Sequence, residues 1–324
     1  MPVLNVRDLV PHSQRDERIA IVAVLLSGLS PNHLIAGWAF SRGSAVRVLQ
    51  MSSEEVATEL PSEAAELLPE KACTQLDAAR KMVDRWKENN LDVRTINDAN
   101  YPGNLLEMFN APPLIFFRGS WNDIQASYSF AVVGTRNPSR AGKKHATDFT
   151  AAFVEAGFTI ISGLATGIDT IAHQVALEEG GQTLAVMGTG IDTVFPVENR
   201  NLAEKICARG ALCTQFFPSF RGRPWSFPER NKTMSGLTLA TVVIEAGERS
   251  GTRSQVDAAL KQGRAVFLHE DLVGSQKWAR SYVEKGKHGT HAISVSKPDD
   301  ILNRFVGDLP RKLENTSPVQ LKLA

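Results

Sequence analysis

The feature that most constrains this chain is an alternation of apolar strands and helices from residue 129 to residue 295. The strands expected there are near-continuous runs of Val, Ile, Leu and Phe, at residues 130–134, 158–162, 183–188, 211–216, 240–246 and 265–269. Helical segments separate them, at residues 142–157, 169–181, 199–210, 231–237 and 252–263. Continuous apolar strands are typical of parallel strands covered on both faces, and strand–helix alternation builds parallel units. The sequence therefore predicts an α/β fold with an open, doubly wound, mostly parallel sheet.

The N-terminal part of the chain has a different sequence pattern, which predicts a small helical domain over residues 1–90. Apolar positions recur at helical spacing from Ile19 to Leu26, and Gly28 with Pro31 interrupts that helix. The segment LSGLSPNHL, residues 26–34, fits two structures. It is either half of a helix-hairpin-helix, which presents backbone amides to DNA phosphates, or a plain helix–turn–helix packing unit.

A second domain is expected over residues 91–306, and a C-terminal tail over residues 307–324. Two β-rich runs, residues 91–96 and 113–117, precede the alternating region and predict extra strands attached to its sheet. A helix is expected at residues 299–305, immediately before the tail.

Composition sets limits on the class of protein. The 324 residues carry a net charge of +1, with 43% hydrophobic and 22% charged residues, as in ordinary globular proteins. This charge excludes a nucleic-acid binder that acts through a charged tail, but it allows a neutral protein with one basic face. No signal peptide or apolar run of ~18 residues is found, and the cysteines (Cys73, Cys207 and Cys213) have no metal-ligand or redox spacing. We therefore expect a cytoplasmic protein without a metal, a cofactor or a membrane partner.

Four glycine-bearing loops follow expected strands at the carboxyl edge of the sheet, where doubly wound proteins bind ligands. They are GTRNPS at 134–139, GLATGID at 163–169, GTGIDTVFPVEN at 188–199 and EAGERSGT at 245–252. Glycines let the backbone approach an oxygen-rich group closely, and a helix N-terminus after each loop favours an anion. The glycines also fit a simpler role in tight turns, but four such loops at one edge favour a phosphate-binding crevice.

The candidate phosphate-binding residues are glycines, hydroxyl side chains and cations in or beside these loops. From the loops and the residues beside them they are Gly134, Thr135, Arg136, Lys143, Lys144, Ser162, Gly163, Gly167, Ser250, Gly251 and Thr252. The loop before the helix at 231–237 adds Arg230, Asn231 and Lys232. That loop interleaves basic residues with Phe217, Phe220, Trp225 and Phe227, a pattern that suits single strands because bases stack on aromatic faces. Phe227 is expected to pack onto the sheet instead.

Acidic residues near the crevice are interpreted as structural. Asp169 suits a helix N-cap, and His173, four residues later, lies within reach of a bond to it. Glu245 is the best acid/base candidate, although accepting backbone amides of its own loop, residues 245–252, explains it better. No nucleophile flanked by a base is found, and residues 134–142 lack a dinucleotide fingerprint, which argues against an NAD-dependent oxidoreductase.

Four blocks in this order and spacing closely resemble the signature of the DprA/Smf DNA-processing family: SGLATGIDTIAHQVAL, AVMGTGIDTVFPVENRNL, FPERNKTMSGL and VVIEAGERSGT. The helical N-terminus, SAM-like or helix-hairpin-helix-like, fits that family's region before the core. The resemblance implies an extended Rossmann-like core that binds single-stranded DNA without catalysis, forms a homodimer and assists RecA loading in natural transformation. It assigns the binding role to Arg136, Ser162, Gly163, Gly167, Arg230, Asn231, Lys232, Ser250, Gly251 and Thr252.

The chain departs from the family pattern at several positions. Lys232 stands where the family usually has Arg, Thr214-Gln215 replaces Ser-Glu, and Phe195 replaces Tyr. After the last core strand, His269, Glu270 and Asp271 replace a Pro-Gly loop, and these carboxylates would repel phosphate if they faced the crevice.

Two alternatives to DNA binding stay open. Related Rossmann-like families, such as the cytokinin-activating phosphoribohydrolases, place a Glu and an SGT-like loop after a strand, so Glu245 and residues 250–252 also fit a sensor or hydrolase of a nucleotide-like molecule. The third hypothesis is an interaction protein that keeps the fold and has lost its ligand. The basic and aromatic loop at 217–232 favours single-stranded DNA over both.

Overall fold

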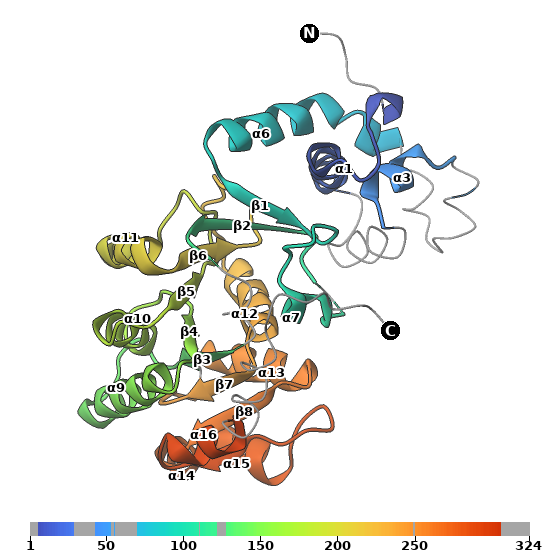
Figure 1. Ribbon diagram of the computed structural model, residues 1–324. Helices are drawn as coiled ribbons and strands as arrows, with labels where there is room; N and C mark the ends of the chain where they lie inside the picture. The colour runs from blue at the N-terminus through green and yellow to red at the C-terminus, as the bar shows by residue number, and fades with distance from the viewer. Residues whose placement is uncertain are drawn as a thin grey trace.

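The computed structural model of the chain describes residues 6–28, 43–52, 55, 70–109, 111–121, 128–248 and 250–305. Within these residues, nine strands form one sheet in the order β1-β2-β6-β5-β4-β3-β7-β8-β9 (Figure 1). The strands are β1 (Asp92–Thr95), β2 (Leu114–Gly119), β3 (Ser129–Val133), β4 (Thr159–Ser162), β5 (Thr183–Val186), β6 (Ala211–Thr214), β7 (Ala240–Val243), β8 (Ala265–His269) and β9 (Ile293–Val295). Strands β3 to β9 run parallel, whereas β1 and β2 add an antiparallel edge beside β6. The predicted α/β fold with a mostly parallel sheet is confirmed.

Helices connect and cover these strands. They are α1 (Gln14–Ser27), α3 (Ala45–Gln50), α6 (Leu76–Glu88), α7 (Gly103–Leu106), α9 (Arg140–Glu155), α10 (Ile168–Glu178), α11 (Arg200–Arg209), α12 (Ser226–Leu237), α13 (Thr252–Lys261), α14 (Glu270–Ser275), α15 (Lys277–Glu284) and α16 (Asp299–Phe305), with 3-10 turns η1 (Val6–Asp8) and η2 (Val197–Asn199). The helix expected at 299–305 is present as α16. The sequence did not predict α14, α15 or the short edge strand β9, whose three residues are too few to show a periodicity.

Alternate residues of the central strand β3 enter two different apolar clusters. Phe130 and Val132 pack on one face with Phe149 of α9 and Ile301 of α16, all of them buried. Ala131 and Val133 face the other side, in the cluster that holds α12 and α13. Because both faces of the strand are buried, its sequence is a continuous apolar run and lacks the alternation of apolar and polar residues that marks a half-exposed strand.

The N-terminal helices pack against each other and against the antiparallel edge of the sheet. One cluster of buried apolar side chains runs from α1 through Trp86 of α6 to Phe116 of β2 and on to the strands beyond. Trp86 meets Phe116 edge-on with ring centroids 4.9 Å apart, and Arg18 of α1 lies 3.6 Å from the Asp98 carboxylate. The division of the chain at residues 90/91 stays a prediction.

The end of the first N-terminal helix lies where the sequence predicts it. Helix α1 ends at Ser27, and Gly28 caps it with a positive φ of 66°, which agrees with the predicted interruption at Gly28. Residues 29–34 of the LSGLSPNHL segment and the tail at 307–324 lie outside the described residues. Within the described part of the chain, no helix combines the length and the apolar character needed to cross a membrane.

Candidate functional site

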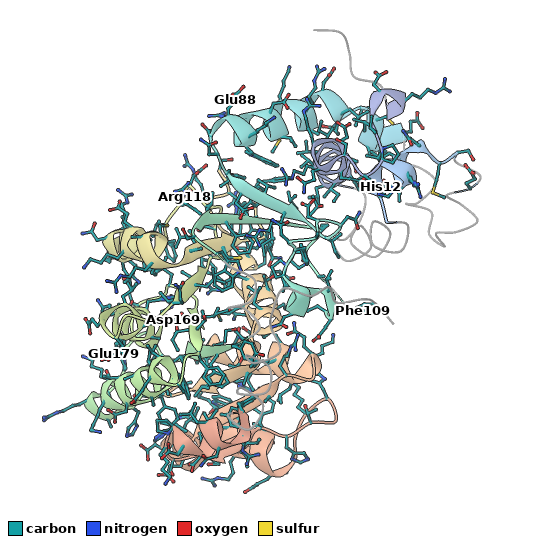
Figure 2. The ribbon with its side chains drawn as sticks, in the orientation of Figure 1. His12, Glu88, Phe109, Arg118, Asp169 and Glu179 are labelled. Carbon is teal, nitrogen blue, oxygen red and sulfur yellow. The ribbon has the colours of Figure 1, made fainter. Side chains whose placement is uncertain are left out.

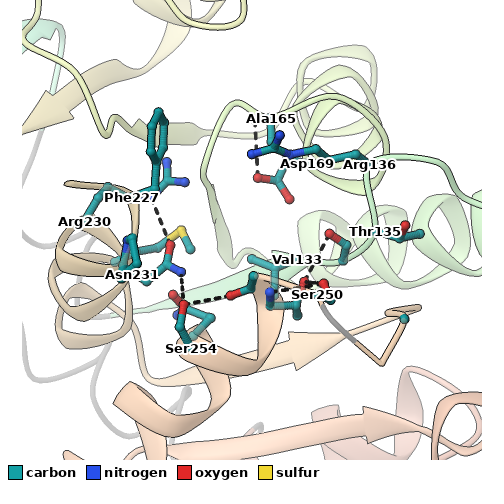
Figure 3. Close-up of a pocket in the computed structure, with 17 residues that line it drawn as sticks. Val133, Thr135, Arg136, Ala165, Asp169, Phe227, Arg230, Asn231, Ser250 and Ser254 are labelled. Atoms are coloured by element: carbon teal, nitrogen blue, oxygen red, sulfur yellow. Dashed lines mark hydrogen bonds between the residues drawn. The ribbon is translucent and has the colours of Figure 1, made fainter. Parts of the chain in front are cut away.

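The strand order creates a switch point beside β3. From β3 the chain moves outward through β4, β5 and β6, and it then returns to β7 on the opposite side of β3. Loops that follow β3 and β7 therefore leave the sheet in opposite directions, and a crevice opens between them. A pocket of about 540 Å³ lies at this position. Figure 3 shows Phe227, Arg230 and Asn231 of α12 on one side of this switch-point pocket, and Thr135 and Arg136 on the other.

Three of the four predicted loops contribute to the pocket lining; the fourth, residues 188–199, does not, so the expectation that all four meet in one crevice is wrong. The candidate residues that line it are Gly134, Thr135, Arg136, Arg230, Asn231, Ser250, Gly251 and Thr252. The sequence missed Ala165, Met234, Ser254 and Gln255, which also line it. Met234 and Gln255 stand four residues after Arg230 and Gly251 on their helices, so helical spacing from those candidates was the signal that could have found them.

Close backbone contacts join the loops after β3, β4 and β7. The Thr135 amide donates to the Glu245 carbonyl at 2.6 Å, and the Ile168 amide donates to the Thr135 carbonyl at 3.1 Å. A Cβ at Gly167, whose φ is +82°, would lie 2.3 Å from the Thr135 oxygen, and one at Gly134 would lie 2.8 Å from the Glu245 oxygen. Glycine is therefore required at both positions for the loops to meet.

The N-terminus of α13 faces the pocket through Ser250, Gly251 and Thr252. The Ser250 hydroxyl donates to Thr252 Oγ1 at 2.9 Å, and Thr252 Oγ1 reaches the Gly134 carbonyl at 3.2 Å. A Cβ at Gly251 would meet no atom within 4 Å, so the space in front of this turn is open. An open helix N-terminus with hydroxyl groups beside it is a favourable place for an anion.

Arg230 is the buried cation of the pocket wall. Its Nη1 donates to the carbonyl of Gly163 at 2.7 Å and to that of Val186, and its Nε donates to Asn231 Oδ1 at 3.0 Å. Only 7% of the residue is exposed. Burial, the main cause, lowers the pKa of Arg230 to about 10, although Asp169 acts in the opposite direction. The guanidinium therefore stays charged near neutral pH and ties the end of β5 to the loop after β4.

Asp169 is buried beside this arginine, inside the molecule, whereas Glu179 just beyond α10 lies at the surface (Figure 2). The Asp169 carboxylate accepts the amides of Gly163 at 3.1 Å and Ala165 at 3.4 Å. Burial raises the pKa of Asp169, and Arg230 counteracts that rise. The predicted N-cap role is wrong because Gly167 occupies the cap position, and Asp169 instead orders the loop before the helix.

His173 does not bond to Asp169, so that expectation is also wrong. Its Nδ1 lies 2.7 Å from Thr183 Oγ1, on the neighbouring strand β5. Burial, followed by the charge of Arg230, lowers the pKa of His173 to about 3. The imidazole is neutral at physiological pH and has a packing role.

Arg136 is the exposed cation at the pocket rim. Within the described residues, no hydrogen bond or ion pair engages its guanidinium. A second, shallower hollow beside the first is lined by Arg136, Lys143 and Gly167 among others. Both hollows share Arg136, so Lys143 lies beside the pocket.

Three candidate side chains lie apart from the switch-point pocket. The Ser162 hydroxyl is buried and donates to the Val132 carbonyl at 2.7 Å. Lys144 pairs with Asp148 at 2.5 Å on the surface of α9, and Lys232 pairs with Glu229 at 2.6 Å. None of these three lines the pocket, and Gly163 contacts it through two lining residues, as acceptor from Arg230 and as donor to Asp169.

Glu245 has a different partner from the one expected. Its carboxylate accepts the Ser139 amide at 3.1 Å and the Ser139 hydroxyl at 2.8 Å, at the N-terminus of α9. No amide among the described residues of its own loop donates to this carboxylate, so the expectation that Glu245 orders that loop is not met there. The carboxylate occupies the anion position of α9 itself, and Glu245 is not among the pocket-lining residues.

Aromatic side chains continue from the pocket onto the surface. Phe227 lines the pocket, contrary to the expectation that it only packs onto the sheet, and its ring centroid lies 5.7 Å from that of Phe195. Trp225 is 57% exposed and Phe195 is 52% exposed. Phe220 lies beside Trp225, with centroids 5.7 Å apart. The acidic pair Glu270 and Asp271 begins α14 and does not line the pocket.

Comparison with known proteins gives consistent matches. The family model described as DNA recombination-mediator protein A matches residues 92–306. Protein Smf of Synechocystis is 34% identical over 58% of this chain and 48% of its own length, so the match spans about half of that relative. DNA processing protein DprA of Streptococcus pneumoniae is 38% identical over 65% of this chain and 73% of its own length.

Solved structures agree with this match. The X-ray structure of DprA from Streptococcus pneumoniae superposes with a TM-score of 0.73 at 26% identity, covering 91% of this chain and 99% of that one. A structure of DNA processing protein A from Helicobacter pylori, described for its single-stranded DNA binding mode, has a TM-score of 0.59 at 21% identity. It covers 67% of this chain and 96% of that one, and it supports the fold alone.

Proposed function

Because the chain belongs to the DNA recombination-mediator protein A family, we propose that it binds single-stranded DNA at the switch-point pocket, without catalysis. The observation that carries the proposal is the meeting of the loops after β3 and β7 with the N-terminus of α13 in one pocket, with Arg136 at its rim. The Helicobacter pylori protein of the same fold is described as binding single-stranded DNA.

Phosphate is the group that this pocket suits best. The open turn at Ser250, Gly251 and Thr252 offers a helix N-terminus to an anion. Arg136 adds an exposed guanidinium, which binds phosphate oxygens in a bidentate manner. Lys143 extends the positive charge along the adjoining hollow.

Bases would stack on the aromatic side chains next to the pocket. Phe227 and Phe195 lie at its edge, and the exposed face of Trp225 lies farther along the surface loop. Stacking is tolerant of sequence and contributes about 1–3 kcal/mol per base. We therefore infer that binding has little sequence preference. Gly134, Thr135, Arg136, Lys143, Ser250, Gly251 and Thr252 form the proposed phosphate contacts, while Gly163, Gly167, Arg230 and Asn231 shape the wall. Ser162, Lys144 and Lys232 keep the binding role given by the sequence only as a weaker proposal.

The family also suggests partners. We propose that the protein acts as a homodimer in the cytoplasm and assists the loading of RecA onto the bound strand, in DNA uptake or recombination. These assignments rest on the family resemblance, which spans residues 92–306. The hydrolase alternative has no support in the pocket, because the Glu245 carboxylate is bonded to Ser139 and lies outside the lining.

The test is fluorescence anisotropy of labelled oligo-dT and of a matched duplex, each titrated with the full chain over a salt series. We expect a preference for the single strand and an affinity that falls steeply with salt. Arg136→Ala should weaken binding and reduce the slope of log K against log salt by about 0.7, because one phosphate is no longer neutralised. Lys205→Ala is the matched control, because Lys205 is an exposed cation on α11 that lines neither hollow.

Two results would contradict the proposal. The first is a wild-type protein that binds neither the single strand nor the duplex. The second is an equal change in slope for both variants, which would place the strand outside the pocket.

A further inference from the structure

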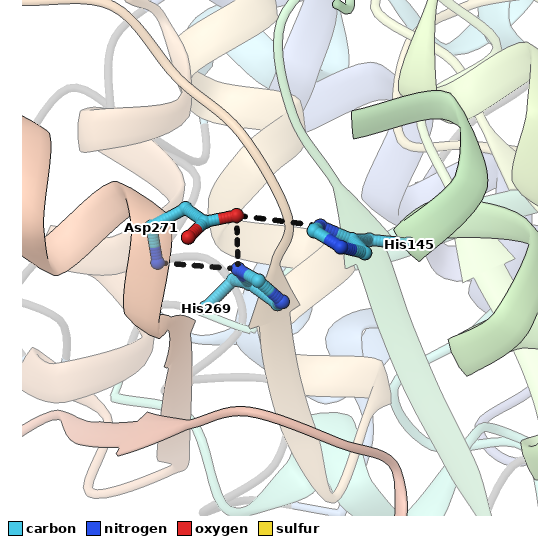
Figure 4. Close-up of side chains that lie close together, drawn as sticks. All are labelled: His145, His269 and Asp271. Carbon is cyan, nitrogen blue, oxygen red and sulfur yellow. Dashed lines mark hydrogen bonds and ion pairs between the residues drawn. The ribbon is translucent and has the colours of Figure 1, made fainter. Parts of the chain in front are cut away.

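A cluster of three potential metal ligands lies away from the switch-point pocket. It consists of His145 in the second turn of α9, His269 at the end of β8 and Asp271 at the start of α14 (Figure 4). One ligand atom from each residue lies within 4.8 Å of the others. His269 and Asp271 stand two residues apart, whereas His145 lies in a distant segment, so the spacing along the chain alone gives no metal-ligand pattern.

The distances within the cluster are unsuited to hydrogen bonds. Asp271 Oδ2 lies 3.7 Å from His145 Nδ1 and 3.6 Å from His269 Nδ1. Good hydrogen bonds between nitrogen and oxygen measure about 2.7–3.2 Å. Two ligands of a tetrahedral ion with bonds of about 2.1 Å are separated by about 3.4 Å. The observed separations are therefore close to those of ligands around a metal ion.

The three side chains also have unused bonding capacity. Within the described residues, no hydrogen bond engages the His145 imidazole or the Asp271 carboxylate, whose contacts are the two long ion pairs above. His269 has a side chain only 3% exposed, and its Nδ1 accepts the Asp271 amide at the long distance of 3.3 Å. Its Nε2 makes no hydrogen bond of good geometry among the described residues, although the Ser296 backbone lies near the imidazole. A buried polar group in this state is costly unless another partner satisfies it.

We propose that His145, His269 and Asp271 bind a divalent transition-metal ion, with Zn²⁺ as the best match. Two imidazoles and one carboxylate are ligands that Zn²⁺ accepts, and the 67% exposed Asp271 side leaves a coordination position open to water. The two imidazoles now stack with centroids 4.1 Å apart and planes inclined by 23°. Coordination requires His145, with a side chain 26% exposed, to leave the stack, and it requires the His269 Nδ1 lone pair to exchange the Asp271 amide for the ion.

The ion would join two parts of the molecule that the chain does not connect directly. His145 belongs to α9, which follows the loop at 134–139, and the other two ligands belong to the β8–α14 junction. None of the three lines the switch-point pocket, so metal binding is separable from DNA binding. We infer a structural clamp on the start of α9.

The test is titration of the metal-free full chain with Zn²⁺ by calorimetry and with Co²⁺ by visible absorption. We expect one ion per chain and the intense visible bands of a tetrahedral Co²⁺ site with nitrogen and oxygen ligands. His145→Gln and Asp271→Asn should each weaken binding by at least about tenfold, because loss of even an outer-shell partner of a metal site costs that much. His288→Gln is the matched control, since His288 forms another His–Asp pair with Asp257 at 3.6 Å and should bind as the wild type.

A second readout does not depend on spectroscopy. Zn²⁺ at about a hundredfold excess over its Kd should raise the Tm of the wild type and of His288→Gln by about 3–6 °C, but not those of the two ligand variants. Both ligand substitutions are at partly or largely exposed side chains, so the variants should fold. Absence of tetrahedral Co²⁺ bands would overturn the proposal. So would equal metal affinity in the wild type and the two ligand variants.

Discussion

At the scale of residues, Arg136 and Arg230 carry the same charge at the same pocket but have different environments. Arg136 is exposed at the rim, whereas Arg230 is buried and donates to the backbone carbonyls of Gly163 and Val186. A guanidinium already bonded to carbonyls has fewer donors left for phosphate. Their roles should therefore separate on mutation, with Arg136 affecting binding and Arg230 affecting stability.

Arg230→Ala should lower the free energy of unfolding by about 3–5 kcal/mol, because it leaves two carbonyls without a donor and Asp169 without its cation. Arg136→Ala should change that free energy by no more than about 0.5 kcal/mol. Urea unfolding of both variants measures the difference. An Arg230→Ala protein as stable as the wild type, but unable to bind DNA, would show that Arg230 is a ligand rather than a structural cation.

His173 predicts a pH dependence of stability. Its pKa is about 3 in the folded chain, against 6.5 for an exposed imidazole, because it is buried. Between these values the unfolded state binds more protons than the folded state, so stability rises with pH in this window and falls on acidification. From pH 7 to pH 5 this one group should remove about 2 kcal/mol from the free energy of unfolding.

Urea midpoints at several pH values check this expectation, with His173→Gln for comparison. The variant lacks the titrating group, so its decrease in stability between pH 7 and pH 5 should be smaller by about 2 kcal/mol. Parallel curves for the two proteins would mean that His173 is protonated equally easily in the folded and unfolded chains.

At the scale of elements, the loops hold their positions through glycines that no side chain can replace. Gly167 has a φ of +82°, and a Cβ there would lie 2.3 Å from the Thr135 oxygen. Gly180, after α10, has a similar φ of +73° but open space around it. Comparing the two separates the cost of the backbone conformation from the cost of the close approach.

Gly167→Ala should lose about 2–4 kcal/mol of unfolding free energy and weaken DNA binding, because the loop carrying Arg136 must shift. Gly180→Ala should lose only about 1–2 kcal/mol and bind DNA as the wild type does. Thermal unfolding and anisotropy measure both effects. Equal losses for the two variants would show that the contact between Gly167 and Thr135 has no energetic importance.

Elements were more predictable from the sequence than contacts. Parallel core strands are recognisable in a sequence as apolar runs, and the four segments that resemble the family signature identified the loops. The sheet and the crevice at its edge could therefore be predicted. Burial of Arg230 was not, because FPERNK reads as a charged, exposed helix start until the loop after β4 is folded against it. The partner of Glu245, Ser139, lies 106 residues away, and the His145–His269 stack joins equally remote positions. Such pairings have no local signature.

At the scale of the whole molecule, the helical N-terminal part and the sheet share one apolar cluster. It includes Ile19 of α1, Trp86 of α6, Phe116 of β2 and Val186 of β5. Elements that share a core tend to unfold together, even where the sequence suggests two domains. The expected division at residues 90/91 would then separate a helical segment from a strand-containing one, while both segments unfold in the same cooperative transition.

Calorimetry of the full chain should therefore show a single transition. Trp86→Ala should shift that whole transition downward, with a loss of about 3–5 kcal/mol, because it empties the junction beside Phe116 and Phe217. Two resolved transitions, with Trp86→Ala affecting only one of them, would establish that the two parts fold independently.

The hydrogen bond between Thr252 and the Gly134 carbonyl spans 118 residues of sequence, and it has a consequence for the chain during its synthesis. A nascent chain leaves the ribosome N-terminus first, so residues 134–139 emerge long before α13 exists. A contact between segments so far apart in sequence forms slowly, and it cannot form before the later segment has emerged. Translation that stops before residue 252 would release strands β3 to β7 but no complete anion-binding surface. Under the proposed function, only chains whose synthesis has passed that point can hold a nucleic acid.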